Sequence, residues 1–519
     1  MKILSLHTLG HDTCISLFQD GKLVYTIETE RISRLRHDSR VEIAIDHIKY
    51  LFNLRDVDIL VFSSDVKNSI AKIENFDKII YNVSAKYLHV ESYSMFLGYR
   101  LPCVIVAHEA CHAMVAYHYT NNINNCLTFV NEGRGTFSRN SLFLCNPGSI
   151  KLLEYDSLPW YGTGFGWSAL SHFAGFGPSP SAAGKAMALA GFGTFSNKIY
   201  EFLKSFHDRL HYKSRNEQLI EYKKLKELLL KKEITIEDVC ITFQKMFTDT
   251  VLKYVTEKSN CNNSALALSG GCALNINTNT NIRDVFGSNL HIPPICNDSG
   301  QSIGAGIYVS EIMLQQKVEP ISVFSGGVDI LDDVKKINGF FKTTEFDAHY
   351  IAEQIANGCI VGFCQGKSEI GPRALGNRSI LASAQINGMK KTVSQKIKKR
   401  EWFRPLGGIM TLSSFNNLFN NQIPSPYMLY NYKMPLGLAP EVTHVDGSSR
   451  IQTLTENNNP RLFSLLSSYK DLTGESILIN TSLNTKGKAM AANVENVIDD
   501  FLDSDIDLFV FGNIIAKRK

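Results

Sequence analysis

A pair of histidines four residues apart is the feature of this sequence with the clearest chemical potential. His108 and His112 lie in the run 106–119, among small residues that would let a helix pack closely against a neighbour. On a helix, side chains four apart face the same way, with Cβ atoms roughly 5–6 Å apart, so both imidazoles could bind one metal ion. Such a site needs further ligands and open positions. The pair therefore indicates either half of a metal site or two unrelated histidines.

Acidic residues at the ends of predicted strands are the candidates for the missing ligands. Glu132 follows the buried run 126–130 and stands beside glycines, and Asp298 opens a helix of small residues. A carboxylate in such a place can bind a metal, although Glu132 could equally form a turn and Asp298 an N-cap. His11 and Asp12 lie in the turn after the first strand, where they would face a cleft or only cap the turn.

Glycine-containing turns and a charged segment are candidates for binding anions in the first part of the chain. A predicted strand, turn and helix place Gly270 and Gly271 in the turn and Asn275 after it. Backbone N–H groups in such a turn bind phosphate oxygens, but the same turn is common without a ligand. Lys185 follows a glycine before a helical run and could hold an anion, without the spacing of a P-loop. The segment 28–37 either presents arginines to phosphates or is a solvated helix start.

Beyond residue 350 the polar chemistry changes to cations. Separate loops contribute basic residues together with amide and hydroxyl side chains: Arg373, Lys398, Arg400, Arg404, Arg450, Asn480 and Ser482. Cations that converge from several loops suit a triphosphate or an acyl phosphate. The alternative is a basic solvated face, but the accompanying Gly-Pro, Asn-Thr-Ser and Phe residues are not what a solvated run requires.

The elements that must position these groups indicate an α/β protein of at least two domains. A chain of 519 residues is too long for one ordinary core. Residues 196–258 read as a helical subdomain beside the cleft, and the mixed polar stretch 315–350 is the predicted linker. We therefore expect domains at 1–330 and 345–519.

Composition and charge exclude several classes of protein. With 44% hydrophobic and 20% charged residues the chain is globular rather than disordered, and no apolar run reaches about 18 residues, the length of a membrane span. A net charge of +4 with dispersed lysines gives no footprint for nucleic acid. The 11 cysteines form no Cys-x-x-Cys pair, which indicates reduced thiols. The first residues read as a strand rather than a signal peptide, so we expect a cytoplasmic protein.

Taken together, these motifs resemble the O-carbamoyltransferase family that includes the nodulation-factor, cephamycin and tobramycin carbamoyltransferases. In the first part of the chain the resemblance rests on His11-Asp12, His108-x3-His112 and Asp298. In the second part it rests on more specific runs, at 369–379, 398–405, 446–453 and 480–484. It extends over nearly the whole chain.

The resemblance implies an actin-like (ASKHA) N-terminal domain and a YrdC-like C-terminal domain that share a two-step reaction. The second domain would bind ATP with Mg2+ and carbamoyl phosphate through the seven cationic and polar residues named above, and make carbamoyl-adenylate. The first domain would bind this intermediate beside a divalent metal, iron (Fe2+) in the family. It would then transfer the carbamoyl group to a hydroxyl of a small-molecule or sugar acceptor.

Carried over by position, the resemblance also gives roles to residues of the first domain. His108, His112 and Asp298, with Glu132 as a further ligand, would hold the metal. His11, with Asp12 beside it, would take the proton from the attacking hydroxyl. The contacts to carbamoyl-adenylate in this domain would be Lys185, Gly270, Gly271, Asn275 and Asn297.

The chain departs from the family pattern at three places. Ala107 and Glu109 flank the first metal histidine, where the family usually has a second histidine or acid before it; Glu132 replaces an aspartate; and the run 187–193 is altered. None of these changes removes a group that the mechanism needs, so we expect an active enzyme. The alternative is a non-catalytic, actin-like nucleotide-binding regulator. The acceptor stays open, and so does the oligomeric state, for which a homodimer is one option.

Overall fold

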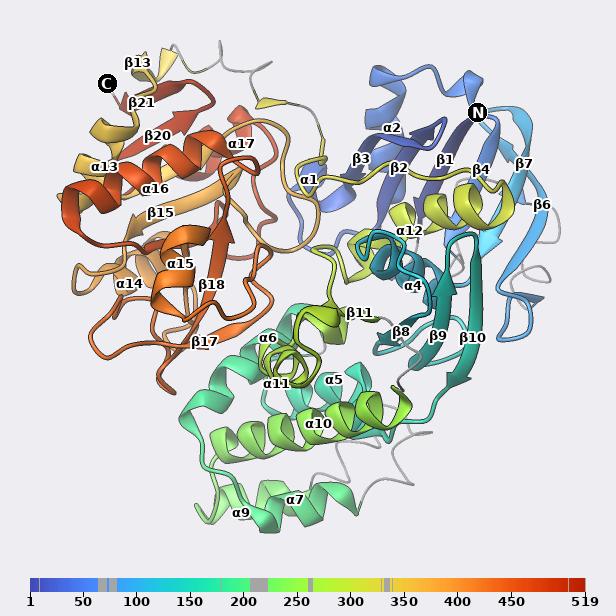
Figure 1. The fold of residues 1–519 in the computed structure, drawn as a ribbon, viewed down its shortest axis with the longest axis horizontal. Helices are drawn as coiled ribbons and strands as arrows, with labels where there is room; N and C mark the ends of the chain where they lie inside the picture. The colour runs from blue at the N-terminus through green and yellow to red at the C-terminus, as the bar shows by residue number, and fades with distance from the viewer. Residues whose placement is uncertain are drawn as a thin grey trace.

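The computed structural model describes residues 1–519 except 9, 64–71, 74–81, 178, 206–222, 260–264, 328, 331–336, 338, 503 and 519. Within these residues the chain is a mixed α/β protein with three β-sheets. Two sheets belong to residues 1–327, called here the N-terminal part, and the third to residues 341–518, called the C-terminal part. Figure 1 shows the C-terminal part, orange to red, as a lobe beside the blue first sheet, with green helices below.

The first sheet contains the strand that was predicted at the first residues. In spatial order its strands are β3 (Lys22–Glu28), β2 (Cys14–Gln19), β1 (Lys2–His7), β4 (Ile59–Ser63), β7 (Tyr99–Val106), β6 (His89–Phe96) and β5 (Lys72–Ile73). β1, β2 and β3 form an antiparallel meander, whereas β1, β4 and β7 run parallel. α1 (Thr29–Ser33) and α2 (Val41–Leu51) follow β3. β1 and β4 are buried almost throughout, as their continuous apolar runs predict.

The second sheet repeats the topology of the first. Its strands, in spatial order, are β10 (Ser149–Tyr155), β9 (Asn140–Asn146), β8 (Cys126–Asn131), β11 (Ala265–Ser269) and β12 (Leu290–His291). β8, β9 and β10 form an antiparallel meander, and β11 and β12 extend the sheet beside β8 and run parallel to it. The strands β3-β2-β1-β4-β7 of the first sheet have the same arrangement, with β1 in the place of β8. The N-terminal part therefore contains the same five-strand arrangement twice.

Two helices lie between these sheets and carry several of the candidate ligands. α12 (Gln301–Ile307) packs on β1, β2 and β4 and also on α4 (His108–His118), which packs on β8 and β11. Small residues make this approach possible, because a Cβ on Gly304 would lie 2.0 Å from the carbonyl oxygen of Cys111. Every residue of α4 is buried. The small residues around the histidine pair are thus a helix-packing surface, as predicted.

The remaining helices of the N-terminal part lie around the second sheet. They are α5 (Gly164–Phe173), α6 (Pro180–Leu189), α7 (Asn197–Lys204), α9 (Lys223–Leu230), α10 (Ile236–Lys258) and α11 (Ile276–Phe286). α10 begins with a capping box between Thr235 and Asp238. The described part of 196–258 is largely helical, and residues 206–222, including the predicted helix start at 221, lie outside the described residues.

The third sheet forms the C-terminal part. Its strands, in spatial order, are β13 (Phe341–Glu345), β21 (Ile514–Arg518), β20 (Leu508–Phe511), β14 (Val361–Cys364), β15 (Arg378–Ser383), β19 (Leu478–Ser482), β16 (Gly407–Thr411), β18 (Ser448–Leu454) and β17 (Asn431–Lys433). The helices are α13 (Ala348–Ala356), α14 (Met389–Lys391), α15 (Leu412–Leu418), α16 (Pro460–Thr473) and α17 (Val494–Phe501). α13 and α16 pack together over an apolar layer of the sheet.

Two expectations about this region are wrong in detail. The predicted linker 315–350 contains β13, which pairs with β21 at the sheet edge. Only Phe341 of β13 is buried, and such an edge strand lacks the apolar signal of a buried one. Asn480 and Ser482, which were expected on a loop, belong to strand β19.

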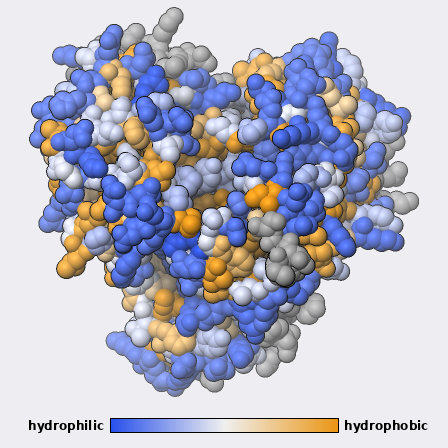
Figure 2. Space-filling view, viewed as in Figure 1, coloured by the Kyte–Doolittle hydropathy of each residue, from blue (hydrophilic) through white to orange (hydrophobic). Residues whose placement is uncertain are grey.

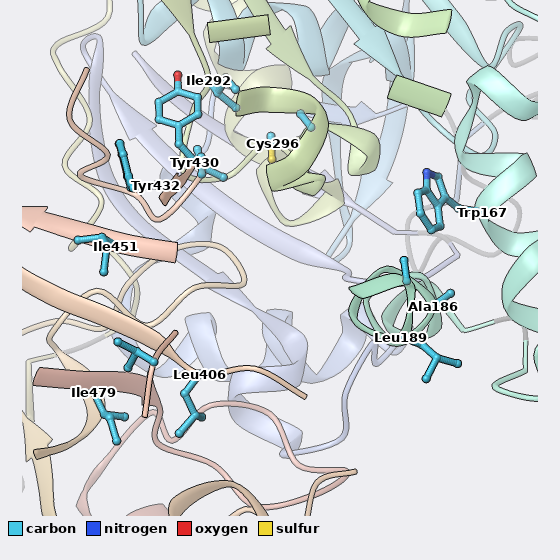
Figure 3. Packing of buried hydrophobic residues seen from close by; sticks show 14 of the residues in the cluster. Trp167, Ala186, Leu189, Ile292, Cys296, Leu406, Tyr430, Tyr432, Ile451 and Ile479 are labelled. Atoms are coloured by element: carbon cyan, nitrogen blue, oxygen red, sulfur yellow. The ribbon is translucent and has the colours of Figure 1, made fainter. Parts of the chain in front are cut away.

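An apolar cluster joins the N-terminal and C-terminal parts. It includes Trp167 and Leu189 from the helices near the second sheet, Cys296, and Tyr430 and Ile479 from the C-terminal part. Figure 3 shows these side chains on the elements that meet there. Arg283 of α11 adds cation–π contacts to the C-terminal part: its guanidinium carbon lies 5.3 Å from the ring centre of Tyr430 and 5.0 Å from that of Tyr432. The two parts are therefore packed together rather than merely tethered.

The outer surface is mainly hydrophilic. In the face seen in Figure 2, apolar side chains are interspersed among polar ones over most of the surface. Across the part of the chain that the structure describes, no helix is both long enough and apolar enough to cross a lipid bilayer.

Candidate functional site

Four predicted metal ligands meet where the two sheets of the N-terminal part face each other. One ligand atom from each of His108, His112, Glu132 and Asp298 lies within 4.8 Å of the other three. Nε2 of His112 is 3.0 Å from Glu132 Oε1 and 3.2 Å from Asp298 Oδ1. Nε2 of His108 is 3.4 Å from the same Asp298 oxygen. The structure thus gathers the four side chains that the sequence left separate.

The fold positions each of these groups by a different element. His108 and His112 lie one turn apart on α4, Glu132 follows the end of β8, and Asp298 opens the turn before α12. The Gly271 N–H donates to Glu132 Oε1 and so fixes that carboxylate. Ser269 Oγ lies 3.4 Å from Nδ1 of His112. These contacts hold the ligands before any ion binds.

The donor set fits a divalent metal ion. The Nε2 atoms of His108 and His112 face each other at 3.1 Å, and without a shared proton or cation two ring lone pairs would repel each other there. Both histidines are only 1% exposed, and two carboxylates lie beside them. Two imidazoles and two carboxylates with nitrogen and oxygen donors suit a borderline ion such as Fe2+.

A second polar group lies against this cluster and contains both predicted catalytic residues. Nδ1 of His11 is 3.1 Å from Asp12 Oδ2 and 3.6 Å from Asp298 Oδ2. The other oxygen of Asp12 is 2.6 Å from Nδ1 of His37, and the Asn297 amide donates to Asp12 at 3.3 Å. Asp12 and His37 both have positive φ, 59° and 58°, a backbone conformation that non-glycine residues adopt at a cost. The loops are therefore held in place to bring a carboxylate between two imidazoles.

The acids around His11 control its protonation. Burial disfavours its charged form, but Asp298 and Asp12 outweigh burial and raise the pKa of His11 to about 9. Asp12 is itself buried, yet hydrogen bonds from His11 and His37 hold the pKa of its carboxyl below the usual range. Asp298 and Glu132, two of the acids that raise the pKa of His11, belong to the four-ligand cluster. The candidate metal ligands are thus among the acids that raise the pKa of His11.

The residues predicted to contact carbamoyl-adenylate in the N-terminal part are already engaged in protein contacts. Asn275 caps α11 through Thr278 N–H and pairs with Gln244. Gly270 has φ +91°, and a Cβ there would lie 2.2 Å from the carbonyl oxygen of Asn131. Gly270 is therefore required by backbone packing, whatever else it does.

Lys185 also differs from its prediction. It lies within α6 rather than at a helix start, and its ammonium group is 2.9 Å from Glu401 of the C-terminal part. Aromatic contacts accompany this ion pair, between Phe192 and Trp402 at 4.9 Å and between Phe176 and Phe403 at 5.9 Å. Lys185 thus joins the two parts of the protein.

The predicted cation cluster is present in the C-terminal part. Arg400 and Arg404 follow a π-helical turn, Thr392–Ile397, and Arg450 lies on β18. Burial and their neighbouring guanidinium groups lower the pKa values of Arg373, Arg400 and Arg450. Nε of Arg373, Nε of Arg450 and Oδ1 of Asn480 are buried and have no hydrogen-bond partner among the described residues. Mutually repelling cations with unused donors are what a polyanion site requires.

Lys398 lies deeper than the arginines. Its ammonium group contacts Ser482 Oγ at 3.2 Å, Asn484 O at 3.0 Å and Asn484 Oδ1 at 2.7 Å, and it also contacts the Ser482 carbonyl. Burial, then Arg400, Arg36 and Arg404, hold the pKa of Lys398 well below its usual range. Lys398 therefore fixes the end of β19 at Ser482 and the turn at Asn484, and its contacts in the structure are to protein oxygens.

One cavity connects the two groups of residues. It has a volume of about 1110 Å³, and its wall includes Asp298 and Glu132 as well as Arg400, Arg404, Arg450 and Ser482. This volume exceeds the range of about 300–1000 Å³ typical of small-molecule pockets. The cavity could therefore hold a nucleotide together with a second substrate.

His37 and His444 line this cavity but were not singled out in the sequence. His37 lies in the charged segment 28–37, where the density of charge was the signal but did not show which side chains face inward. Arg36, which also lines the cavity, was covered by the expectation that this segment presents arginines to phosphates. Burial lowers the pKa of His444 to about 4, and this residue stands two positions before the run 446–453 that the family resemblance covered.

Comparison with known proteins identifies the family. The family model described as "Carbamoyltransferase N-terminus" matches residues 2–307, and "Carbamoyltransferase C-terminus" matches residues 352–518. The chain is 26% identical to nodulation protein NolNO of Sinorhizobium fredii, over 99% of this chain and 80% of that protein. It is also 26% identical to 3'-hydroxymethylcephem-O-carbamoyltransferase of Streptomyces clavuligerus, over 98% of each chain.

Solved structures give weaker matches. Component A of (R)-2-hydroxyglutaryl-CoA dehydratase of Acidaminococcus fermentans superposes with a TM-score of 0.36 at 12% identity, over 59% of this chain and 97% of that one. Full-length HypF, in a phosphate- and nucleotide-bound form, gives a TM-score of 0.32 at 13% identity, over 59% and 54%. Scores this low do not establish a shared fold. The two family models together span most of the sequence, and the chain belongs to the carbamoyltransferase family.

Proposed function

We propose that this protein is an ATP-dependent O-carbamoyltransferase that activates and transfers a carbamoyl group in one cavity. The observation that carries the proposal is one cavity whose wall includes Glu132 and Asp298, two of the four candidate metal ligands in the N-terminal part, together with the arginine cluster of the C-terminal part. The relatives named as O-carbamoyltransferases support the hydroxyl as acceptor. The acceptor would be a small molecule or a sugar.

The arginine cluster would serve the activation step. Carbamoyl phosphate, ATP and water would give carbamoyl-adenylate, pyrophosphate and phosphate. Carbamoyl phosphate and ATP each carry several negative charges, and positioned cations stabilise the charge that develops on the transferring groups. Arg373, Arg400, Arg404 and Arg450 would bind the phosphates, with the unpaired Asn480 oxygen facing the same wall. Lys398 would hold Ser482, at the end of β19, in position.

The transfer step would occur beside the metal cluster. The acceptor hydroxyl would attack the carbamoyl carbon, its oxygen would form the new ester bond, and AMP would leave. Because Nδ1 of His11 faces the Asp12 carboxylate, Nε2 is the atom available to take the hydroxyl proton. Asp12 would orient the ring, and His37 would hold Asp12 from the other side.

The metal ligands would be His108, His112, Glu132 and Asp298. A bound divalent cation, Fe2+ by the family resemblance, would supply Lewis acidity next to the scissile carbonyl or phosphate. The nearby side chains would keep bulk water out, because the ligands and Asp12 are largely buried.

The architecture is consistent with the expected pairing of an actin-like and a YrdC-like domain. The twice-repeated five-strand sheet in the N-terminal part supports a duplicated actin-like domain, with the substrates bound between the repeats. The C-terminal part has a single large mixed sheet with cations at several strand ends, which supports a separate activation domain.

An assay of partial reactions tests the proposal. The protein, loaded with a divalent metal, is incubated with MgATP and carbamoyl phosphate, and pyrophosphate and carbamoyl-adenylate are measured. We expect both products without any acceptor, and transfer to a hydroxyl only when a suitable acceptor is added. The absence of pyrophosphate with every divalent metal tried would overturn the proposal and favour a nucleotide-binding protein without catalysis. Omitting carbamoyl phosphate controls for simple ATP hydrolysis.

A further inference from the structure

The segment 28–37 of the N-terminal part is fastened to the C-terminal part on both sides of its short helix. Arg31 is buried and donates to the carbonyl oxygen of Gly371 at 2.7 Å, while Glu28 accepts from the Gly371 N–H at 2.9 Å. Arg34 pairs with Asp500, and its carbonyl oxygen accepts from Ala489 N–H at 3.0 Å. Of the two alternatives for this segment, these contacts contradict the solvated helix start, since they place the segment in the junction between the two parts.

These anchors fix where the next residue lies. Arg36 follows the bridge between Leu35 and Lys488, and its side chain lines the large cavity together with Arg400, Arg404 and Arg450. It lies close enough to Arg400, Arg404 and Lys398 to disfavour their protonated forms. Arg36 thus belongs to the arginine cluster in space, although it comes from the other part of the chain.

Charge balance indicates what Arg36 faces. Among the described residues, no carboxylate lies within 4.0 Å of the guanidinium groups of Arg36, Arg373, Arg400 or Arg450. Glu401, the acid that does pair here, is shared by Lys185, Arg404 and Lys486. Arginines that line one cavity without carboxylate partners are suited to bind an anionic ligand, because the guanidinium group matches the geometry of phosphate oxygens.

We infer that Arg36 is a phosphate-binding residue that the N-terminal part contributes to the polyphosphate site of the C-terminal part. The site is then composite, and a bound triphosphate or pyrophosphate contacts both parts at once. This inference rests on the proposed function for the identity of the substrate, but not for the anion site itself. The chemistry recognised is a polyphosphate, because Arg36, Arg400, Arg404 and Arg450 line one cavity and together carry more positive charge than a single phosphate would neutralise.

The inference is tested by calorimetry on the full chain at about 0.15 M salt, which measures the binding of inorganic pyrophosphate and of MgATP. Arg36→Met should weaken the binding of pyrophosphate and of MgATP by about tenfold, the effect of one charge-assisted contact. Arg36→Lys should restore part of the lost affinity. Arg55→Met is the matched control, because Arg55 is an exposed arginine that lies over Tyr99 in the first sheet. Since Arg36 is exposed, its variants should melt at the temperature of the wild type.

The outcomes separate the two proposals. Wild-type protein that binds pyrophosphate, with Arg36→Met binding it as tightly as Arg55→Met, would overturn the inference alone. Wild-type protein that binds neither probe would overturn the composite anion site and the proposed activation step together. Weakened binding in Arg36→Met, in a protein that releases no pyrophosphate from ATP and carbamoyl phosphate, would support the inference and refute the proposed function.

Discussion

Gly270 offers a sharp test of how the backbone positions the metal cluster. The residue has φ +91°, and a Cβ at this position would meet three backbone atoms of Asn131, at 2.2 Å from the oxygen, 2.7 Å from the carbon and 2.9 Å from the nitrogen. Backbone cannot rotate away as a side chain can, so Gly270→Ala must separate the ends of β11 and β8. The next residue, Gly271, donates to Glu132, so the separation should displace a candidate metal ligand.

The size of the effect follows from two costs. An alanine at positive φ costs roughly 1–2 kcal/mol, and forcing a methyl group into packed structure costs typically 1–3 kcal/mol. The sum is about 2–5 kcal/mol for Gly270→Ala. Gly287→Ala is the matched control, because Gly287 also has positive φ, at +60°, but nothing lies within 4 Å of its Cβ position. That variant should lose only about 1–2 kcal/mol.

Melting temperature and metal content together measure the consequence. For a domain of 150–250 residues 1 kcal/mol corresponds to roughly 2–4 °C, so Gly270→Ala should melt well below Gly287→Ala. After loading with Fe2+ and desalting, elemental analysis should show reduced metal in Gly270→Ala and wild-type metal in the control. Equal melting temperatures and equal metal contents in the two variants would refute the argument that Gly270 is needed to place Glu132.

Three further predictions concern other residues of the site. His112→Ala should bind less metal by elemental analysis yet still release pyrophosphate from ATP and carbamoyl phosphate; a variant with full metal content would contradict the ligand assignment. His37→Asn should lower the rate constant of carbamoyl transfer by roughly 10–100-fold, because Asp12 loses a charge-assisted hydrogen bond worth about 1.5–3 kcal/mol. The KM of the acceptor and the rate of pyrophosphate release should stay unchanged. A change in KM alone would argue against a positioning role for His37. Burial holds the pKa of His444 at about 4 rather than 6.5, so between these pH values the unfolded chain binds a proton that the folded chain does not. The free energy of unfolding should therefore fall as the pH drops through this window, by at most about 3 kcal/mol. The melting temperature of His444→Gln should depend less steeply on pH from 6.5 to 4, and an unchanged slope would show that His444 is not buried as described.

The parts of the fold that could be predicted are those with a local signal. The strand expected at the first residues is β1, whose apolar run is continuous because both faces of the strand are covered. The spacing of His108 and His112 predicted that they share a helix face, since that geometry depends only on the helical repeat. That Glu132 and Asp298 lie beside them depends on the packing of α4 between two sheets, which no local pattern encodes.

Other features were hidden because they depend on partners distant in sequence. Lys185 and Lys398 both read as anion-binding lysines, yet one faces Glu401 and the other faces Ser482 and Asn484. A lysine in sequence shows its charge but not its counter-charge. β13 was missed because an edge strand with one buried residue resembles a polar linker. The inward side of segment 28–37 is likewise set by its contacts with Gly371 and Asp500.

The four-ligand cluster has a consequence for the stability of the N-terminal part. His112 and Asp298 are separated by 186 positions in the chain. His112 lies on α4 and Asp298 lies in the turn that leads into α12, and these two helices hold the two repeated sheets together. An ion bound by both would act as a cross-link that closes a very long loop, where the entropy lost by the unfolded chain is large. Since a ligand of the folded state alone stabilises that state, the same ion that prepares the transfer site would also lock the two sheets against each other.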